Sequence, residues 1–284
     1  MKQFSFGIMA DSLRLPFAES LAKCRELGAD GVQIYAVEGE MAPENNNAAT
    51  VAEKRRMLAD NGLVVSALCG DLGGHGFCLA DENPAKIERS KRIVDLALEM
   101  GTSIITTHIG VVPADVTCDR YKIMQEACNQ LAEYAHQNGA WFAVETGPEP
   151  AERLRRFLDS LDSKGVGVNL DPANLVMVTG DDPVRAVDTL APYIVHTHAK
   201  DGKMLKPSDP QVIYDSFAVG GIEGLFIDDY FVEMPLGQGN VDFPNYLAAL
   251  QKIGYHGFLT IEREVGANPA ADIQLAMNFL KSLV

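Results

Sequence analysis

The sequence lacks paired cysteines. Its five cysteines are scattered, and no two of them are separated by only two residues. The pattern indicates neither a zinc knuckle nor a disulfide framework, and reduced thiols are typical of a cytosolic protein. The five are Cys24, Cys69, Cys78, Cys118 and Cys128.

A long apolar run is also missing. No uninterrupted apolar stretch of about 18 residues occurs, and Arg14 interrupts the N-terminal segment before such a run develops. We therefore expect neither a signal peptide nor a membrane-spanning helix, and we expect a cytoplasmic location.

Positive charge is scarce. The chain has 24 lysines and arginines against 39 aspartates and glutamates, a formal net charge of −15, and its pI is about 4.8. This balance argues against a nucleic acid or an anionic membrane as partner, because both require concentrated basic side chains. The hydrophobic fraction of 47% is sufficient for a sizeable core.

The sequence does contain a regular alternation of two patterns. Short, nearly continuous apolar runs are typical of buried parallel strands, and the amphipathic stretches between them are typical of helices that end at a glycine. The expected strands are 4–10, 31–37, 64–70, 103–110, 141–147, 166–171, 194–201 and 257–264. The clearest helical stretches are 16–30, 83–101, 119–139 and 241–257.

Eight strand and helix units in 284 residues predict a single (β/α)₈ TIM barrel. No segment has the composition of a linker, so we expect one domain over 1–284 with a long loop at about 203–240. A doubly wound open sheet would need a phosphate loop after the first strand, and IMADSLRLP is not one. The glycines of GDLGGHGF (70–77) follow the third strand and are typical of a loop at a barrel mouth.

Acidic and imidazole side chains end four consecutive expected strands. They are Glu145, Asp171, His198 and Glu262. Because the active sites of such barrels form at the C-terminal ends of the strands, we expect these four to converge. Three carboxylates and one imidazole suit a hard divalent cation such as Mn²⁺, Mg²⁺ or Co²⁺, and less decisively Zn²⁺.

The motifs VETG, NLDPANL, HTHAKD and IERE, in this order, resemble those of the xylose isomerase-like TIM barrel superfamily. The most similar branch is that of the sugar phosphate isomerases and epimerases, including D-tagatose 3-epimerase-like and inosose-metabolism enzymes. The resemblance implies one divalent metal, most simply Mn²⁺, on the four side chains named above. It also implies that Glu145 and Glu262 move the proton as catalytic acid and base.

One position departs from the family pattern. Sugar 3-epimerases and AP endonucleases of the superfamily carry a histidine three residues after the matching aspartate, where this chain has Asn174. In the endonucleases that histidine helps to hold a third metal. The substitution, together with the acidic balance, argues against a trinuclear zinc nuclease and leaves the substrate open.

Three of the expected ligands have alternatives. His196 shares a strand face with His198, since strand side chains alternate, but it lies farther from the strand end, where we expect a packing or supporting role. Glu264 shares a face with Glu262, and the family register selects Glu262. Asp171 precedes a proline, so its carboxylate also suits an Asx turn.

Further candidates for contacting substrate surround these ligands. His108 ends the fourth strand, and a structural role is the alternative for this side chain. We expect a second group near the mouth: His75, Asn174, Lys200, Asp201 and Glu233. The aromatic-rich interval at about 203–240 predicts a lid folded over the site or a contact between copies in a homo-oligomer.

The main functional hypothesis is a metal-dependent isomerase or epimerase of a small sugar, sugar phosphate or polyol ketone, acting through an enediolate. The same site suits a dehydratase or lyase acting on a keto sugar or inosose, including cleavage of a 3-keto-glycoside. A third hypothesis is a non-catalytic sugar-binding or complex-forming subunit. The expected partner is a small-molecule carbohydrate.

Overall fold

The computed structural model describes residues 3–284, in which eight parallel strands close into a barrel. Their order around the barrel is β1-β10-β7-β6-β5-β4-β3-β2. Neighbouring strands therefore follow one another along the chain, since β8 and β9 form a separate sheet, and the first strand pairs with the last to close the barrel. The TIM barrel predicted from the alternating pattern is confirmed, strand by strand. The strands are β1 (Ser5–Met9), β2 (Gly31–Tyr35), β3 (Val64–Cys69), β4 (Ile104–Thr107), β5 (Trp141–Glu145), β6 (Val166–Leu170), β7 (Ile194–Ala199) and β10 (Phe258–Ile261).

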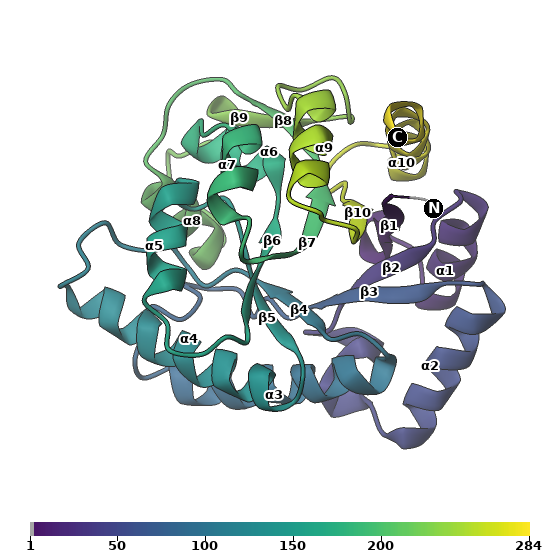
Figure 1. Ribbon diagram of the computed structural model, residues 1–284, viewed down its shortest axis with the longest axis horizontal. Helices are drawn as coiled ribbons and strands as arrows, with labels where there is room; N and C mark the ends of the chain where they lie inside the picture. The colour runs from purple at the N-terminus through teal and green to yellow at the C-terminus, as the bar shows by residue number, and fades with distance from the viewer. Residues whose placement is uncertain (1–2) are drawn as a thin grey trace.

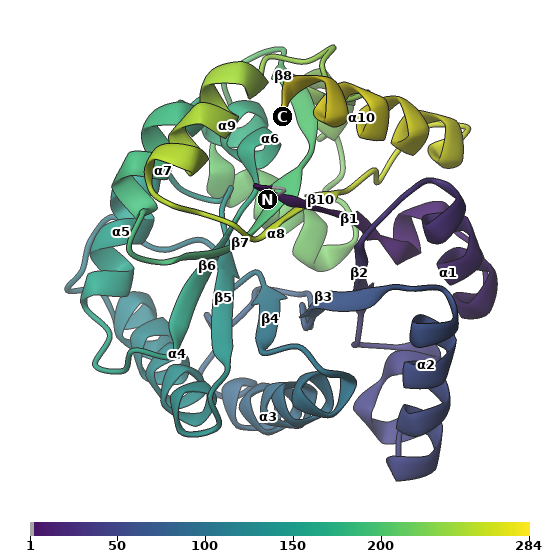
Figure 2. The same cartoon turned by 45° about the vertical axis from the view of Figure 1, so that its right-hand side comes forward.

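Helices surround the barrel on its outer side (Figures 1 and 2). Proline occupies the first turn of α3, α7, α9 and α10. Backbone N–H groups in the first turn have no acceptor within the helix, so proline, which lacks this group, costs no hydrogen bond there. Gly101 ends α3 in the left-handed conformation, with φ of 93°. The helices are α1 (Phe17–Glu26), α2 (Ala48–Asp60), α3 (Asn83–Met100), α4 (Asp119–Gln137), α5 (Ala151–Asp159), α7 (Pro183–Leu190), α9 (Phe243–Lys252) and α10 (Pro269–Leu283).

The strands are buried on both faces. Every residue of β6 is buried, and the core that joins strands to helices runs through the whole barrel. The five cysteines are free thiols, as expected. Within residues 3–284 no helix combines the length and the apolar character needed to cross a membrane.

The interval between β7 and α9 folds over one end of the barrel. It contains an antiparallel pair, β8 (Asp201–Met204) and β9 (Phe231–Met234), and the helix α8 (Pro210–Val219). A π-helical turn, Leu175–Thr179, follows the short helix α6 (Pro172–Asn174). Met177 and Val178 of this turn form a second apolar cluster, against which Tyr214 and Phe231 of the covering segment pack.

Close backbone approach at Gly202 makes this packing possible. A Cβ atom on Gly202 would lie 2.3 Å from the Met177 sulfur, so only glycine fits between β8 and the π-helical turn. The covering segment, residues 201–234, is therefore packed on the barrel through a cluster of its own. We call it the lid.

Asp201, the first residue of the lid, binds the backbone of the segment that follows the lid. Its Oδ1 accepts the backbone N–H groups of Gly202 at 2.9 Å and Val241 at 3.1 Å, while Oδ2 accepts those of Gly237 at 3.0 Å and Gly239 at 2.8 Å. The carboxylate is buried and lies outside the cavity at the barrel mouth. The expectation that Asp201 contacts substrate is therefore corrected, because both oxygens are occupied by backbone donors.

Replacing Asp201 with alanine should destabilise the fold by about 3 kcal/mol, because buried N–H groups lose their acceptors. Asp201→Asn, whose amide oxygen keeps one of the two acceptors, should give an intermediate loss. Urea unfolding measures both, with the exposed Asp81→Ala as control. Equal stability of the alanine variant and the wild type would contradict this role.

Candidate active site and metal centre

Four side chains from four neighbouring strands converge inside the C-terminal end of the barrel. One ligand atom from each of Glu145, Asp171, His198 and Glu262 lies within 4.8 Å of the other three, and all four residues are buried. Glu145 ends β5, Asp171 follows β6, His198 lies in β7 and Glu262 follows β10. The convergence expected from the strand ends is therefore present.

His198 stands at the centre of the group. Its Nδ1 lies 3.3 Å from Asp171 Oδ2, 3.4 Å from Glu262 Oε2 and 3.6 Å from Glu145 Oε1. Burial works against its charged form, yet the surrounding carboxylates outweigh burial and raise the pKa of His198 well above its usual value.

The donor set fits a divalent cation. The ring Nε2 of His198 lies 2.9 Å from Gln33 Oε1, to which it donates, so that Nδ1 is left to face the carboxylates. Three buried carboxylates repel one another, and positive charge placed among them offsets this repulsion. Oxygen ligands with one imidazole are typical of Mn²⁺, Mg²⁺ and related ions.

His196 supports the group from one layer deeper, as the strand register predicts. Its Nδ1 donates to Asn169 Oδ1 at 2.8 Å, and its Nε2 accepts from Thr260 Oγ1 at 3.0 Å. Burial, with His198 nearby, lowers the pKa of His196 well below its usual value, so the ring stays neutral. Asn169, oriented in this way, donates to Glu145 Oε2 at 3.1 Å.

Asp171 combines both roles considered for it. Its Oδ1 caps α6 by accepting the backbone N–H groups of Ala173 at 2.8 Å and Asn174 at 3.1 Å. Its Oδ2 remains directed at His198. The turn that the following proline begins therefore holds the carboxylate in place.

Lys200 lies beside Glu262 and is buried. Its Nζ donates to Glu262 Oε2 at 2.9 Å and also contacts Glu264. Burial opposes its charge, but Glu262 and Glu264 outweigh burial and raise the pKa of Lys200 well above its usual value. For Glu262, burial raises the pKa, and the Lys200 and His198 charges lower it by more, so Glu262 is ionised.

A cavity of about 1110 Å³ opens at this group, with Glu145 and Glu262 in its wall. Of the expected substrate contacts, His75, His108, Asn174, Lys200 and Glu233 line it. The lining also includes residues that the sequence did not predict as substrate contacts, among them Asp71, Met177 and Tyr214. Asp71 follows β3, so the strand-end rule would have found it, whereas Met177 reaches the cavity from the π-helical turn and Tyr214 from α8 of the lid.

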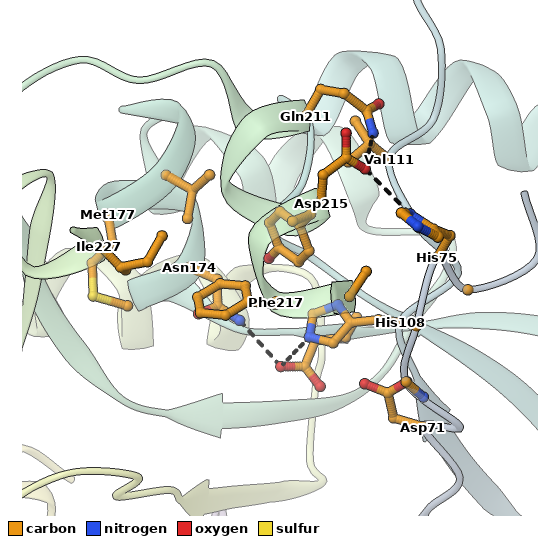
Figure 3. A pocket seen from close by; sticks show the side chains of 18 of the residues that line it. Asp71, His75, His108, Val111, Asn174, Met177, Gln211, Asp215, Phe217 and Ile227 are labelled. Atoms are coloured by element: carbon orange, nitrogen blue, oxygen red, sulfur yellow. Dashed lines mark hydrogen bonds and ion pairs between the residues drawn. The ribbon is translucent and has the colours of Figure 1, made fainter. Parts of the chain in front are cut away.

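His108 stands beside Glu145, with Nε2 3.7 Å from Glu145 Oε1 (Figure 3). Burial lowers its pKa, but the charge of Glu145 and more distant carboxylates raise it by more, so the net direction is upward. The ring packs edge-to-face against Tyr214, with centroids 5.6 Å apart. Asn174 donates to the same Glu145 oxygen at 3.2 Å.

Two further candidates belong to the rim. His75, in the glycine loop after β3, contacts Asp215 of α8, with Nδ1 3.2 Å from Oδ1 (Figure 3). Glu233 of β9 accepts from Arg263 Nη1 at 2.6 Å, and Arg263 also donates to Asp272 at 2.8 Å. Arg263 is thus a structural residue that holds the Glu233 carboxylate at the cavity wall.

The comparisons with known proteins agree with this geometry. The model of the family described as xylose isomerase-like TIM barrel matches residues 21–283. The chain belongs to this family. Its members similar to this chain include both epimerase-like and dehydratase proteins.

Three similar proteins illustrate that range. A xylose isomerase domain protein from Planctomyces limnophilus superposes with a TM-score of 0.79 at 25% identity, covering 99% of this chain and 96% of the other. A D-tagatose 3-epimerase-like protein superposes with a TM-score of 0.74 at 18% identity, covering 99% and 98%. An inosose dehydratase from Lacticaseibacillus casei is 25% identical over 171 residues, which is 59% of this chain and 55% of that protein. This chain thus spans about half the length of that curated relative.

Replacing His198 should weaken metal binding far more than replacing His196. We expect His198→Ala to weaken Mn²⁺ binding by about 100-fold or more, and His196→Ala by at most about tenfold. Calorimetric titration of the folded variants with Mn²⁺ measures both. Equal losses in the two variants would contradict the assignment of His198 as the ligand.

Glu149, in the loop before α5, gives the fold a pH dependence. It is buried, its Oε2 accepts from the Val112 N–H at 2.9 Å, its Oε1 has no partner, and burial raises its pKa from 4.5 to about 7. Between these pH values the folded protein keeps a proton that the unfolded chain has lost. Stability should therefore fall as the pH rises from 4.5 to 7, by about 3 kcal/mol.

Glu149→Gln removes this titration. The unfolding free energy of the variant, measured in urea at pH 5 and pH 7.5, should fall less between the two pH values than that of the wild type. An identical fall in both proteins would show that Glu149 does not titrate in this range.

Proposed function

We propose that the protein is a divalent-metal-dependent isomerase or epimerase that removes a proton from the carbon beside the carbonyl of a sugar or polyol ketone. The observation that carries this proposal is the presence of two carboxylates, Glu145 and Glu262, in one buried group with Asp171 and His198. Since β6 and β7 lie between β5 and β10, Glu145 and Glu262 stand on either side of the other two ligands.

The two carboxylates act as base and acid. Burial raises the pKa of Glu145, but His198 and His108 lower it by more, and Glu262 is held ionised in the same way by Lys200 and His198. Either carboxylate can therefore accept a proton near neutral pH. One carboxylate removes the proton to form an enediolate. In isomerisation the same carboxylate returns the proton to the adjacent carbon, and in epimerisation the other carboxylate takes up a proton from water and delivers it to the opposite face.

A bound divalent cation, proposed as Mn²⁺, supplies the positive charge that stabilises the enediolate oxygens. It would be held by Glu145, Asp171, His198 Nδ1 and Glu262. Lys200, His108 and Asn174 are proposed to contact the substrate hydroxyls, with Glu233 and His75 at the rim. Similar proteins named for epimerases and inosose dehydratases support a small carbohydrate as substrate and give no support for nucleic acid.

Elimination of water is the second candidate function, and the position of His108 favours it. After proton removal, loss of a neighbouring hydroxyl requires an acid, and a cavity-lining histidine of raised pKa beside Glu145 supplies one. The dehydratase relatives at the sequence level are consistent with this chemistry.

Glu262→Gln should stop proton removal while leaving the fold intact. We expect the rate of deuterium incorporation at the α-carbon, followed by NMR with Mn²⁺-loaded protein and a panel of ketohexoses and inososes in D₂O, to fall about 1000-fold. The matched control is Glu264→Gln, two residues along the same face and half-exposed, which should stay within about fivefold of the wild type. Exchange in Glu262→Gln at the wild-type rate, or none by the wild type on any of these compounds, would refute the proposal.

His108→Asn separates the two reactions. If the protein eliminates water, this variant should retain α-proton exchange within about tenfold while formation of the dehydrated product falls about 100-fold. Product analysis by NMR in the same samples gives both rates. An equal fall in both would show that His108 serves proton removal instead of the leaving group.

A further inference from the structure

The cavity is larger than one sugar ring requires. Its volume of about 1110 Å³ slightly exceeds the roughly 300–1000 Å³ of pockets that enclose drug-sized ligands. The polar side chains that contact the reacting atoms, including Glu145, Lys200 and Glu262, occupy only one part of its wall. A free ketose bound there leaves the remaining volume to water.

The rest of the wall mixes polar side chains, among them Arg120, Asp215 and Asp228, with apolar side chains that come largely from the lid. Met177 of the π-helical turn and Ile227 lie together on one side of the cavity, while His108 and Asp71 lie on the other (Figure 3). Phe217 of α8 reaches the same space and is 55% exposed. We call the part of the cavity lined by Met177, Phe217, Ile227 and Phe231 the apolar end; Phe231 packs against Met177.

An aromatic row connects the two parts. The His108 ring packs edge-to-face on Tyr214, with centroids 5.6 Å apart, and Tyr214 packs in the same way on Phe217, at 5.9 Å. The row runs from the carboxylate Glu145 to the apolar end.

The apolar end is already formed without a ligand. Phe231 and Tyr214 pack on the buried cluster of Met177 and Val178, so the wall is held by the protein's own contacts. Exposed apolar surface inside a preformed cavity favours an apolar occupant, because covering it removes the surface from water without ordering a loop.

We propose that this end of the cavity is a subsite for an apolar, ring-sized substituent of the substrate. The substrate class is then a keto sugar or keto polyol carrying such a group in glycosidic linkage, with the carbonyl at the metal ligands and the substituent between Phe217 and Ile227. This inference rests on the proposed function for the position of the carbonyl.

Two glycosides that differ only in the substituent test the subsite. The phenyl and methyl β-glycosides of 3-keto-D-glucose are titrated calorimetrically into the Mn²⁺-loaded protein. The phenyl compound should bind about tenfold tighter or more, because a ring of apolar surface is buried. Phe217→Ala and Ile227→Ala should each reduce this preference to below about threefold.

Val219→Ala is the matched control, since Val219 lies on the same helix, is 60% exposed and lies outside the cavity wall. This variant should keep the full preference. Equal affinity for the two glycosides, no binding of either, or an undiminished preference in Phe217→Ala would overturn the subsite. Failure of the proposed function is seen separately, as absence of α-proton exchange on the ketose and inosose panel, which does not depend on the substituent.

Discussion

The mutual repulsion of three buried carboxylates is the constraint on which the rest of the site depends. One carboxylate oxygen from each of Glu145, Asp171 and Glu262 lies within 4.8 Å of the others and of a His198 ring nitrogen, and all four side chains are buried. Such a group is stable only with positive charge among its members. The barrel supplies part of this charge through Lys200 and fixes the ligands through amides below: Gln33 directs His198, and Asn169 directs Glu145. The His196 ring, one layer deeper in the barrel, stays neutral because its pKa is lowered. The charged side chains therefore lie at the cavity floor.

The lid then determines what can approach that floor. It is not a loose loop, since Asp201 secures one end through four backbone N–H groups and the π-helical turn supports its centre. It contributes Tyr214, Phe217 and Ile227 to a cavity whose floor is made of charged side chains. Polar chemistry at the strand ends and an apolar wall from the insertion are therefore parts of one space, and a substrate with a polar head and an apolar group fits both.

Sequence alone predicts the parts of this protein that depend on local periodicity. The eight strands follow from short apolar runs, and the ligands follow from the rule that such barrels react at their strand ends. His196 and His198 were separable because strand register sets depth in a barrel. Asp201 could not be assigned from sequence, because its partners are backbone N–H groups near residues 237–241, brought near by tertiary folding. Met177 reaches the cavity through a π-helical turn that no apolar spacing indicates, and Phe217 through packing of the lid.

The most direct test of the central claim is the anomalous diffraction signal of crystals grown with Mn²⁺. The account predicts one strong peak bonded to Glu145, Asp171, His198 Nδ1 and Glu262. No peak at these atoms, or a peak held by other residues of the cavity, would contradict it.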